Sequence, residues 1–135
     1  MTQPPRGRHD DRVLRVLVVD DQGSFRETMA LVFRYSDGIE LTAAADSGEQ
    51  AIRLVEQGLD IDLALIDVNL GGLDGVATAD RLHDFDVTTV LTSTYDLSEL
   101  PVAVSGSSSP YVPKRDIDPT HLVELWERGH QQPGA

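Results

Sequence analysis

The sequence contains no cysteine, only one lysine and no long apolar run. Without cysteine, the chain can form no disulfide framework, no thiolate metal site and no cysteine nucleophile. No stretch approaches the roughly 20 apolar residues that span a bilayer. The opening residues, MTQPPRGRHDDR, also lack the apolar core of a signal peptide. We therefore expect a cytoplasmic protein with no membrane partner.

Positive charge is scarce as well. Eleven Lys and Arg residues stand against 23 Asp and Glu residues, which gives a formal net charge of −12. A chain this acidic is repelled by the phosphate backbone that supplies most nucleic-acid affinity. Direct binding to nucleic acid is therefore not expected.

The length of 135 residues leaves room for a single domain. Residues 1–12 contain proline and glycine but almost no apolar side chains, so we predict a disordered leader there. Residues 130–135 have the same character and are predicted to be a disordered tail. Residues 13–129 then form the folded domain.

Short apolar and β-branched runs alternate with helical patterns along this domain. The strongest candidates for strands buried on both faces are Val16–Val19, Leu63–Ile66 and Val87–Leu91. Weaker candidates are Ile39–Ala45 and Tyr111–Val112. Strands separated by helices form right-handed βαβ units with parallel strands. The predicted fold class is α/β, a doubly wound five-stranded parallel sheet with helices on both faces.

Helix-capping residues precede two of the helical patterns. Ser24 is predicted to cap a helix over Phe25–Tyr35, and Ser47 to cap a second helix that ends near Gly58. Two further patterns run from Gly75 to about His83 and onward from Asp118, with Pro119 at the first helical position.

Polar residues follow the predicted strands at the points where the apolar runs stop. They are Asp20 and Asp21 after the first strand, Asp67 after the third, Thr92 after the fourth and Lys114 after the fifth. Doubly wound sheets bind ligands at this edge. Two like charges about 4 Å apart repel by roughly 4 kcal/mol at an effective dielectric near 20, so converging carboxylates need a counter-ion. Mg²⁺ suits a set without imidazole or thiol.

A carboxylate beside a Mg²⁺ ion is a candidate phosphoryl acceptor, because Asp side chains can form aspartyl-phosphates. Phosphoryl transfer also needs positive charge and hydrogen-bond donors around the transferred oxygens. Lys114, the only lysine, and Thr92 are residues of the required types. These residues indicate phosphoryl-transfer chemistry centred on Asp67.

In these residues the chain resembles the receiver domain of two-component response regulators. The matching stretches are RVLVVDDQGSFRE (15–27), LALIDVNLGGLDG (63–75), VLTS (90–93) and YVPK (111–114). They span nearly all of the predicted domain. The resemblance implies a flavodoxin-like receiver topology.

The resemblance also implies a set of metal ligands. Asp67 would be the phosphoacceptor, and Asp21, Asp67 and the backbone carbonyl of Asn69 would bind a Mg²⁺ cofactor. Asp20 would contribute through water.

Further roles that the resemblance implies concern the phosphoryl group and the response to it. Thr92 would donate a hydrogen bond to that group and Lys114 would pair with one of its oxygens. Tyr111 would be the aromatic switch residue whose rotamer follows Thr92. The phosphoryl donor would be a histidine kinase or phosphotransfer protein. A downstream protein would read the signal, and phosphorylation could produce a homodimer.

The chain departs from the usual receiver pattern in three places. Gly71 stands where the family often has proline, so that loop is expected to be more flexible. Arg115 follows Lys114 where proline is common, so the usual cis peptide is not expected. Residues 96–110 contain prolines, a glycine and several serines, which disfavour a full fourth helix. We predict a short turn at Leu97–Leu100, a strand-like or irregular Val102–Val104 and a mobile loop at Ser105–Ser109.

Two other functions compete with the phosphoacceptor. The first is a receiver-like protein-interaction module that is not phosphorylated, a hypothesis that the irregular 96–110 segment motivates. The second is a Mg²⁺-dependent phosphohydrolase or a flavodoxin-like cofactor binder. Asp20 and Asp21 argue against cofactor binding, because they would repel a phosphate at the first strand end. An Asp-based phosphatase would be expected to place a DxD motif there, whereas this chain has DDQ.

Overall fold

The structure is a computed structural model that describes residues 13–130. The predicted leader, residues 1–12, and residues 131–135 of the predicted tail lie outside the described residues. His130, which was predicted to belong to that tail, is instead helical. The strands are β1 (Leu14–Val19), β2 (Ile39–Ala45), β3 (Leu63–Asp67) and β4 (Thr88–Thr92). The helices are α1 (Gly23–Arg34), α2 (Gly48–Glu56), α3 (Gly75–His83), α4 (Val102–Ser105) and α5 (Pro119–His130). None of the helices within 13–130 is long and apolar enough to cross a membrane.

The strands form one parallel sheet in the order β2-β1-β3-β4. In the register of the central pair, Val16 lies opposite Leu63 and Val19 opposite Ile66. Because β1 and β3 are the inner strands, their side chains are buried on both faces of the sheet. Continuous apolar runs are typical of such strands, which is why these two were the clearest in the sequence.

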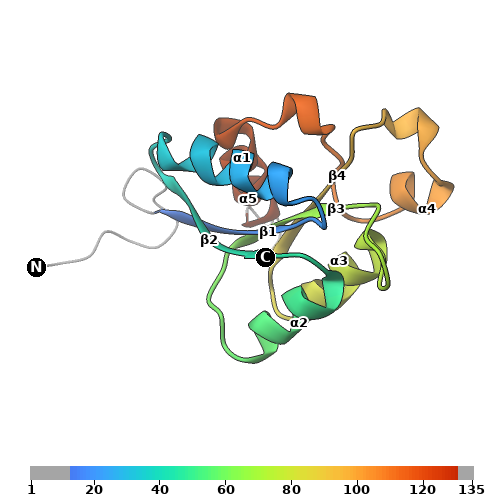
Figure 1. Cartoon of the computed structure of the whole chain (residues 1–135), viewed down its shortest axis with the longest axis horizontal. Helices are drawn as coiled ribbons and strands as arrows, with labels where there is room; N and C mark the ends of the chain where they lie inside the picture. The colour runs from blue at the N-terminus through green and yellow to red at the C-terminus, as the bar shows by residue number, and fades with distance from the viewer. Residues whose placement is uncertain (1–12, 131–135) are drawn as a thin grey trace, which may run out of the picture.

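Helices cover both faces of the sheet (Figure 1). On one face, Met29 and Phe33 of α1 and Leu122 of α5 pack against Val16 and Val18 of β1. On the other face, α2 and α3 pack against the alternate residues of the same strand. The predicted doubly wound parallel arrangement is therefore confirmed, and it brings the carboxyl ends of the strands to one edge.

One predicted helix cap is confirmed and the other is wrong. Ser47 caps α2, since its hydroxyl accepts a hydrogen bond from the N–H of Gln50 at 3.1 Å. Ser24 does not cap α1, which begins one residue earlier at Gly23. The residue before that helix, Gln22, is held by its N–H, which donates to the Asp20 carboxylate at 2.8 Å. The helix start is therefore fixed by the end of β1 rather than by a serine.

The prediction of five strands is wrong, because the sheet has four among the described residues. Tyr111 forms only an isolated bridge with Leu91. There the N–H of Leu91 donates to the Pro110 carbonyl, and the N–H of Val112 donates to the Leu91 carbonyl, each at 2.9 Å. The next rung toward the start of β4 would need an N–H from residue 110. Proline has none, so the ladder stops.

The segment between β4 and the Tyr111 bridge forms no full-length helix, as predicted. A 3₁₀ turn at Leu97–Glu99 matches the predicted turn, and α4 is a single turn of four residues. The expectation of a strand-like or irregular Val102–Val104 is wrong, because these residues form most of α4. Burial of Val104 against the sheet explains the helical turn, since that side chain is 2% exposed. No peptide bond within the described chain is cis, as expected at Arg115.

Candidate functional site

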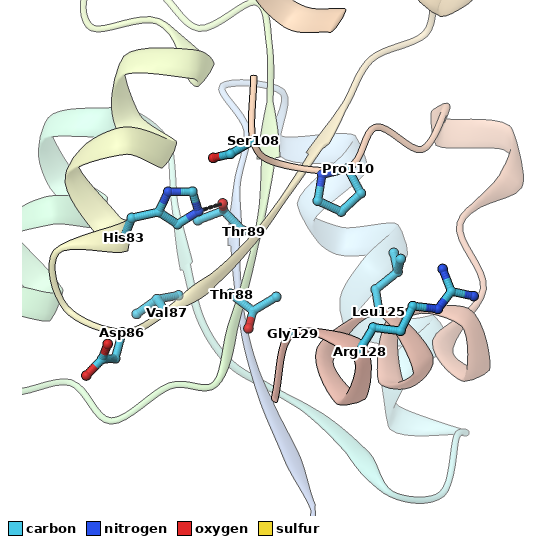
Figure 2. A pocket seen from close by; sticks show the side chains of 10 residues that line it. All are labelled: His83, Asp86, Val87, Thr88, Thr89, Ser108, Pro110, Leu125, Arg128 and Gly129. Atoms are coloured by element: carbon cyan, nitrogen blue, oxygen red, sulfur yellow. Dashed lines mark hydrogen bonds between the residues drawn. The ribbon is translucent and has the colours of Figure 1, made fainter. Parts of the chain in front are cut away.

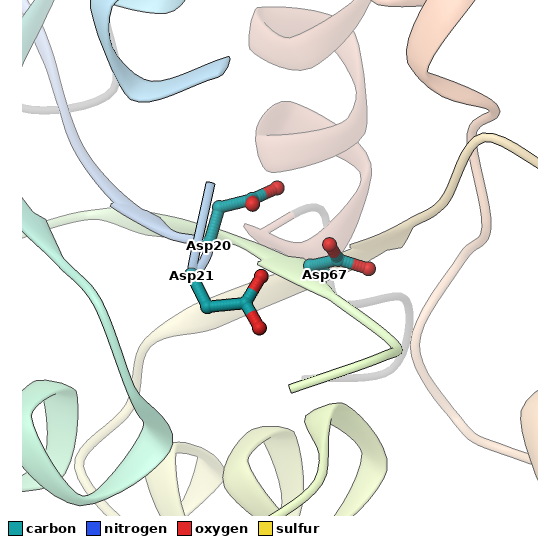
Figure 3. Close-up of side chains that lie close together, drawn as sticks. All are labelled: Asp20, Asp21 and Asp67. Atoms are coloured by element: carbon teal, nitrogen blue, oxygen red, sulfur yellow. The ribbon is translucent and has the colours of Figure 1, made fainter. Parts of the chain in front are cut away.

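Three carboxylates converge at the carboxyl edge of the sheet. Asp20 and Asp21 follow β1, and Asp67 is the last residue of β3 (Figure 3). Carboxylate oxygens of all three lie within 4.8 Å of one another. Asp20 and Asp67 are buried, whereas Asp21 is exposed. The predicted acidic site is therefore present, with one member open to solvent.

The chain after β3 holds Asp67 in place. The N–H of Asn69 donates to Asp67 Oδ1 at 2.9 Å. Gly75, the first residue of α3, packs directly against the strand end, because a Cβ there would lie 2.3 Å from the Asp67 carbonyl oxygen. Only glycine allows this approach. The loop from Asn69 to Gly75 thus contacts both the carboxylate and the backbone carbonyl of Asp67.

Lys114 reaches the acidic cluster from the segment that follows the Tyr111 bridge. Its ammonium nitrogen lies 2.8 Å from Asp20 Oδ2 and 3.3 Å from Asp67 Oδ2. The backbone helps to set this position, since the N–H of Lys114 donates to the Ser93 carbonyl at 2.8 Å. The only lysine therefore pairs with two of the three carboxylates.

Burial and charge change the pKa values of both partners. Burial raises the pKa of Asp67 from 3.8 to about 6, and the charge of Asp20 adds to that rise. The Asn69 N–H opposes the rise by stabilising the ionised carboxylate. Burial acts to lower the pKa of Lys114, but its two carboxylate partners outweigh burial and raise that pKa above its usual value. The lysine stays charged while Asp67 resists ionisation.

The donor set fits a Mg²⁺ ion. Three carboxylates lie together and the lysine pairs with only two of them, so the site carries an excess of negative charge that a divalent cation would neutralise. Every side chain in the acidic cluster offers oxygen, the ligand atom that Mg²⁺ prefers. Asp21 is the member that a hydrated ion can reach from solvent. The roles of the three carboxylates and of the Asn69 carbonyl as metal ligands stay predictions.

Thr92 lies beside Asp67, because the two residues pair in the register of β3 and β4. Its side-chain oxygen is buried and has no hydrogen-bond partner among the described residues. A buried hydroxyl without a partner is costly, so its presence at this place calls for an explanation. Thr92 is therefore placed at the site as predicted.

Tyr111 lies outside the acidic cluster. Its hydroxyl donates a hydrogen bond to the Tyr95 carbonyl, in the segment directly after β4. This contact links Tyr111 to the chain that follows Thr92. Its predicted role as a switch stays a prediction.

Sequence reasoning missed two side chains of α1 that contact the site. Phe25 places its ring under the Lys114 ammonium, which lies 4.3 Å from the ring centroid. Arg26 donates from its guanidinium to the Asp20 carbonyl at 2.6 Å. Both residues lie in the first turn of α1, and no local sequence pattern indicates either contact.

A second hollow of about 880 Å³ lies at the other end of β4 (Figure 2). His83 Nε2 and Thr89 Oγ1 are 2.6 Å apart beside it, and Thr89 Oγ1 is also 2.6 Å from Ser109 Oγ. His83 is an exposed residue at the end of α3, and its ring contacts this hydroxyl pair. The hollow is separate from the acidic cluster, because none of the residues that line it belongs to that cluster.

The chain is similar to known proteins over most of its length. A family model described as the response regulator receiver domain matches residues 16–126. The nitrate/nitrite response regulator protein NarP of Escherichia coli is 31% identical over 118 residues, which cover 85% of this chain and 54% of NarP. A protein-glutamate methylesterase/protein-glutamine glutaminase of Alkalilimnicola ehrlichii is 30% identical over 88% of this chain and 31% of its own length. The chain thus spans about half or less of these curated relatives.

Solved structures show the same likeness. The signal receiver domain of the putative response regulator NarL from Mycobacterium tuberculosis has a TM-score of 0.70 and 26% identity. That alignment covers 90% of this chain and 99% of the other. The signal receiver domain of a modulated diguanylate cyclase from Desulfovibrio desulfuricans has a TM-score of 0.72 and 26% identity, over 87% of this chain and 93% of the other.

Proposed function

This chain belongs to the response regulator receiver domain family, and from that premise we propose that Asp67 accepts a phosphoryl group in a Mg²⁺-dependent reaction. The observation that carries the proposal is the buried Asp67 carboxylate, which shares one cleft with two further carboxylates and the only lysine. The donor is a histidine kinase or a phosphotransfer protein. A carboxylate oxygen of Asp67 attacks the phosphorus, the nitrogen–phosphorus bond of the donor histidine breaks, and an acyl phosphate forms.

The residues around Asp67 support each part of this reaction. A pKa of about 6 leaves the carboxyl group mostly ionised above neutral pH, so it can act as a nucleophile. Mg²⁺, held by Asp21, Asp67 and the Asn69 carbonyl with Asp20 in the outer sphere, would offset the negative charge of the incoming group. Lys114 pairs with a phosphoryl oxygen in place of one of its present carboxylate contacts. The cleft therefore offers both a nucleophile and the charges that phosphoryl transfer requires.

The response to phosphorylation starts at Thr92. Its hydroxyl, which has no hydrogen-bond partner among the described residues, donates to the phosphoryl group. A shift of Thr92 displaces the following segment, whose Tyr95 carbonyl is bound by Tyr111. The Tyr111 side chain then changes rotamer and alters the nearby surface. We propose that another protein, or a second copy of this chain, reads that change.

Incubation with Mg²⁺ and acetyl phosphate, followed at once by intact mass measurement, tests the acceptor. We expect wild type and the exposed-carboxylate control Asp80→Asn to gain one phosphoryl group, and Asp67→Asn to gain none. Beryllofluoride titration, followed by amide NMR shifts, covers the case in which the acyl phosphate hydrolyses before detection. If wild type and Asp67→Asn respond identically in both measurements, the proposed function is wrong.

A further inference from the structure

The Lys114 ammonium is enclosed on more than one side. Asp20 and Asp67 supply oxygens at 2.8 and 3.3 Å, and the ring centroid of Phe25 lies 4.3 Å away. The lysine side chain is only 11% exposed. An ammonium group has three N–H donors and no acceptor. The two carboxylates accept some of the hydrogen bonds that the ammonium group can donate, and the aromatic ring covers part of its remaining surface.

A ring in this position attracts the cation and also displaces water. The face of an aromatic ring carries negative charge density and attracts an ammonium group within about 6 Å of the centroid. The attraction is stronger where water is excluded, as it is for this lysine. A leucine of similar bulk would cover the same surface without the attraction. An aromatic residue at this position therefore holds the ammonium in a way that an aliphatic residue does not.

The position of Phe25 follows from the helix period. Phe25, Met29 and Phe33 are spaced by four residues and lie on one side of α1, the side that packs against the sheet. Met29 and Phe33 are buried in the core, whereas Phe25 is only partly buried, at the end of that row. Core packing accounts for an apolar side chain at this end. Core packing does not explain why this side chain is an aromatic ring that lies beneath the Lys114 ammonium.

We propose that Phe25 is a positioning residue that holds Lys114 over the Asp67 carboxyl group, ready to pair with an incoming phosphoryl oxygen. The inference rests on the proposed function, because it assigns Phe25 a share in the rate of phosphoryl acceptance. It predicts that removing the ring frees the ammonium while leaving the acidic cluster intact.

NMR of the chain labelled with ¹³C-lysine tests the positioning directly and needs no phosphorylation. Because the chain has one lysine, every lysine signal belongs to Lys114. We expect its two Hε protons to have different chemical shifts in wild type, as in a held side chain, and to merge in Phe25→Leu. Phe25→Tyr keeps them apart. The matched control Phe33→Leu, in the same row of α1, leaves them unchanged. Equal Hε splitting in wild type and Phe25→Leu would overturn the proposal.

The rate of phosphorylation by acetyl phosphate tests the functional part. We expect Phe25→Leu to slow it about threefold to tenfold, in line with the strength of a partly desolvated cation–π contact, and Phe25→Tyr to restore it. In a Lys114→Met background the same substitution changes the rate less than about twofold, since Phe25 then has no cation to hold. If Lys114→Met is phosphorylated too slowly to measure, the affinities of the variants for beryllofluoride are compared instead of their phosphorylation rates.

The outcomes separate the two proposals. If Phe25→Leu has the same effect with and without Lys114, Phe25 acts independently of the lysine and the inference is wrong. If wild type neither gains a phosphoryl group nor binds beryllofluoride, the proposed function fails. In that case the lysine NMR still decides whether Phe25 holds Lys114.

Discussion

Ionisation of Asp67 is expected to destabilise the folded chain in the absence of Mg²⁺. The carboxyl group is buried beside Asp20, which raises its pKa from 3.8 to about 6. A group whose pKa is higher in the folded state stabilises that state while it is protonated. This stabilisation is complete below the unfolded pKa and is lost as the pH rises through the folded one. The loss therefore falls between about pH 4 and pH 7.

The size of the loss follows from the difference between the two pKa values. Each pKa unit corresponds to about 1.4 kcal/mol, so the rise from 3.8 to about 6 corresponds to roughly 3 kcal/mol. Asp67→Asn removes the ionisable group and keeps an oxygen that can accept from the Asn69 N–H. Across this pH range the free energy of unfolding of wild type should fall by about 3 kcal/mol relative to Asp67→Asn.

Urea unfolding followed by circular dichroism measures this difference. Wild type, Asp67→Asn and the exposed control Asp80→Asn are compared between about pH 4 and pH 8, first in EDTA and then in millimolar Mg²⁺. Subtracting the curves removes the contribution of the other carboxylates. Mg²⁺ binds the folded state and should restore the stability of wild type near neutral pH, with a smaller effect on Asp67→Asn. Parallel curves for wild type and Asp67→Asn in EDTA would refute the reasoning.

Two further predictions concern the scaffold. Gly75→Ala should lower the free energy of unfolding by about 2 to 3 kcal/mol, because the new methyl group would meet the Asp67 carbonyl at 2.3 Å; Gly71→Ala, which adds its methyl group in open space, should change it little. Ser47→Ala should cost about 1 kcal/mol through loss of the α2 cap. Ser24→Ala should cost less, and equal losses in the two serine variants would contradict the assignment of the caps. Urea titration measures all four.

The acidic cluster could be predicted because it depends on topology alone. Asp20, Asp21 and Asp67 each follow a continuous apolar run, and parallel strands bring such positions to one edge. Lys114 was found in the same way, although its segment forms a single bridge rather than a strand. The order of elements therefore sufficed to place these side chains.

Other features depend on contacts that no local pattern contains. The Asp20 carboxylate binds the Gln22 N–H and thereby sets the start of α1. Ser24, two residues later, therefore lies inside the helix and does not cap it. The fifth strand was predicted from two β-branched and aromatic residues, but the missing N–H of Pro110 decided its length. The ring of Phe25 beneath Lys114 joins residues far apart in the sequence, and only the folded chain shows it.

The strand order β2-β1-β3-β4 has a consequence for how the chain is made. β1 is synthesised before the other three described strands, yet it is an inner strand whose Val16 pairs with Leu63. Parallel pairs require closure of a long loop before their contacts form, so such sheets fold slowly. Until β3 emerges, β1 can pair only with β2, and its other edge has no partner strand. An unfinished chain carries only part of the net charge of −12, but its acidic excess already makes unfinished chains repel one another, which opposes aggregation.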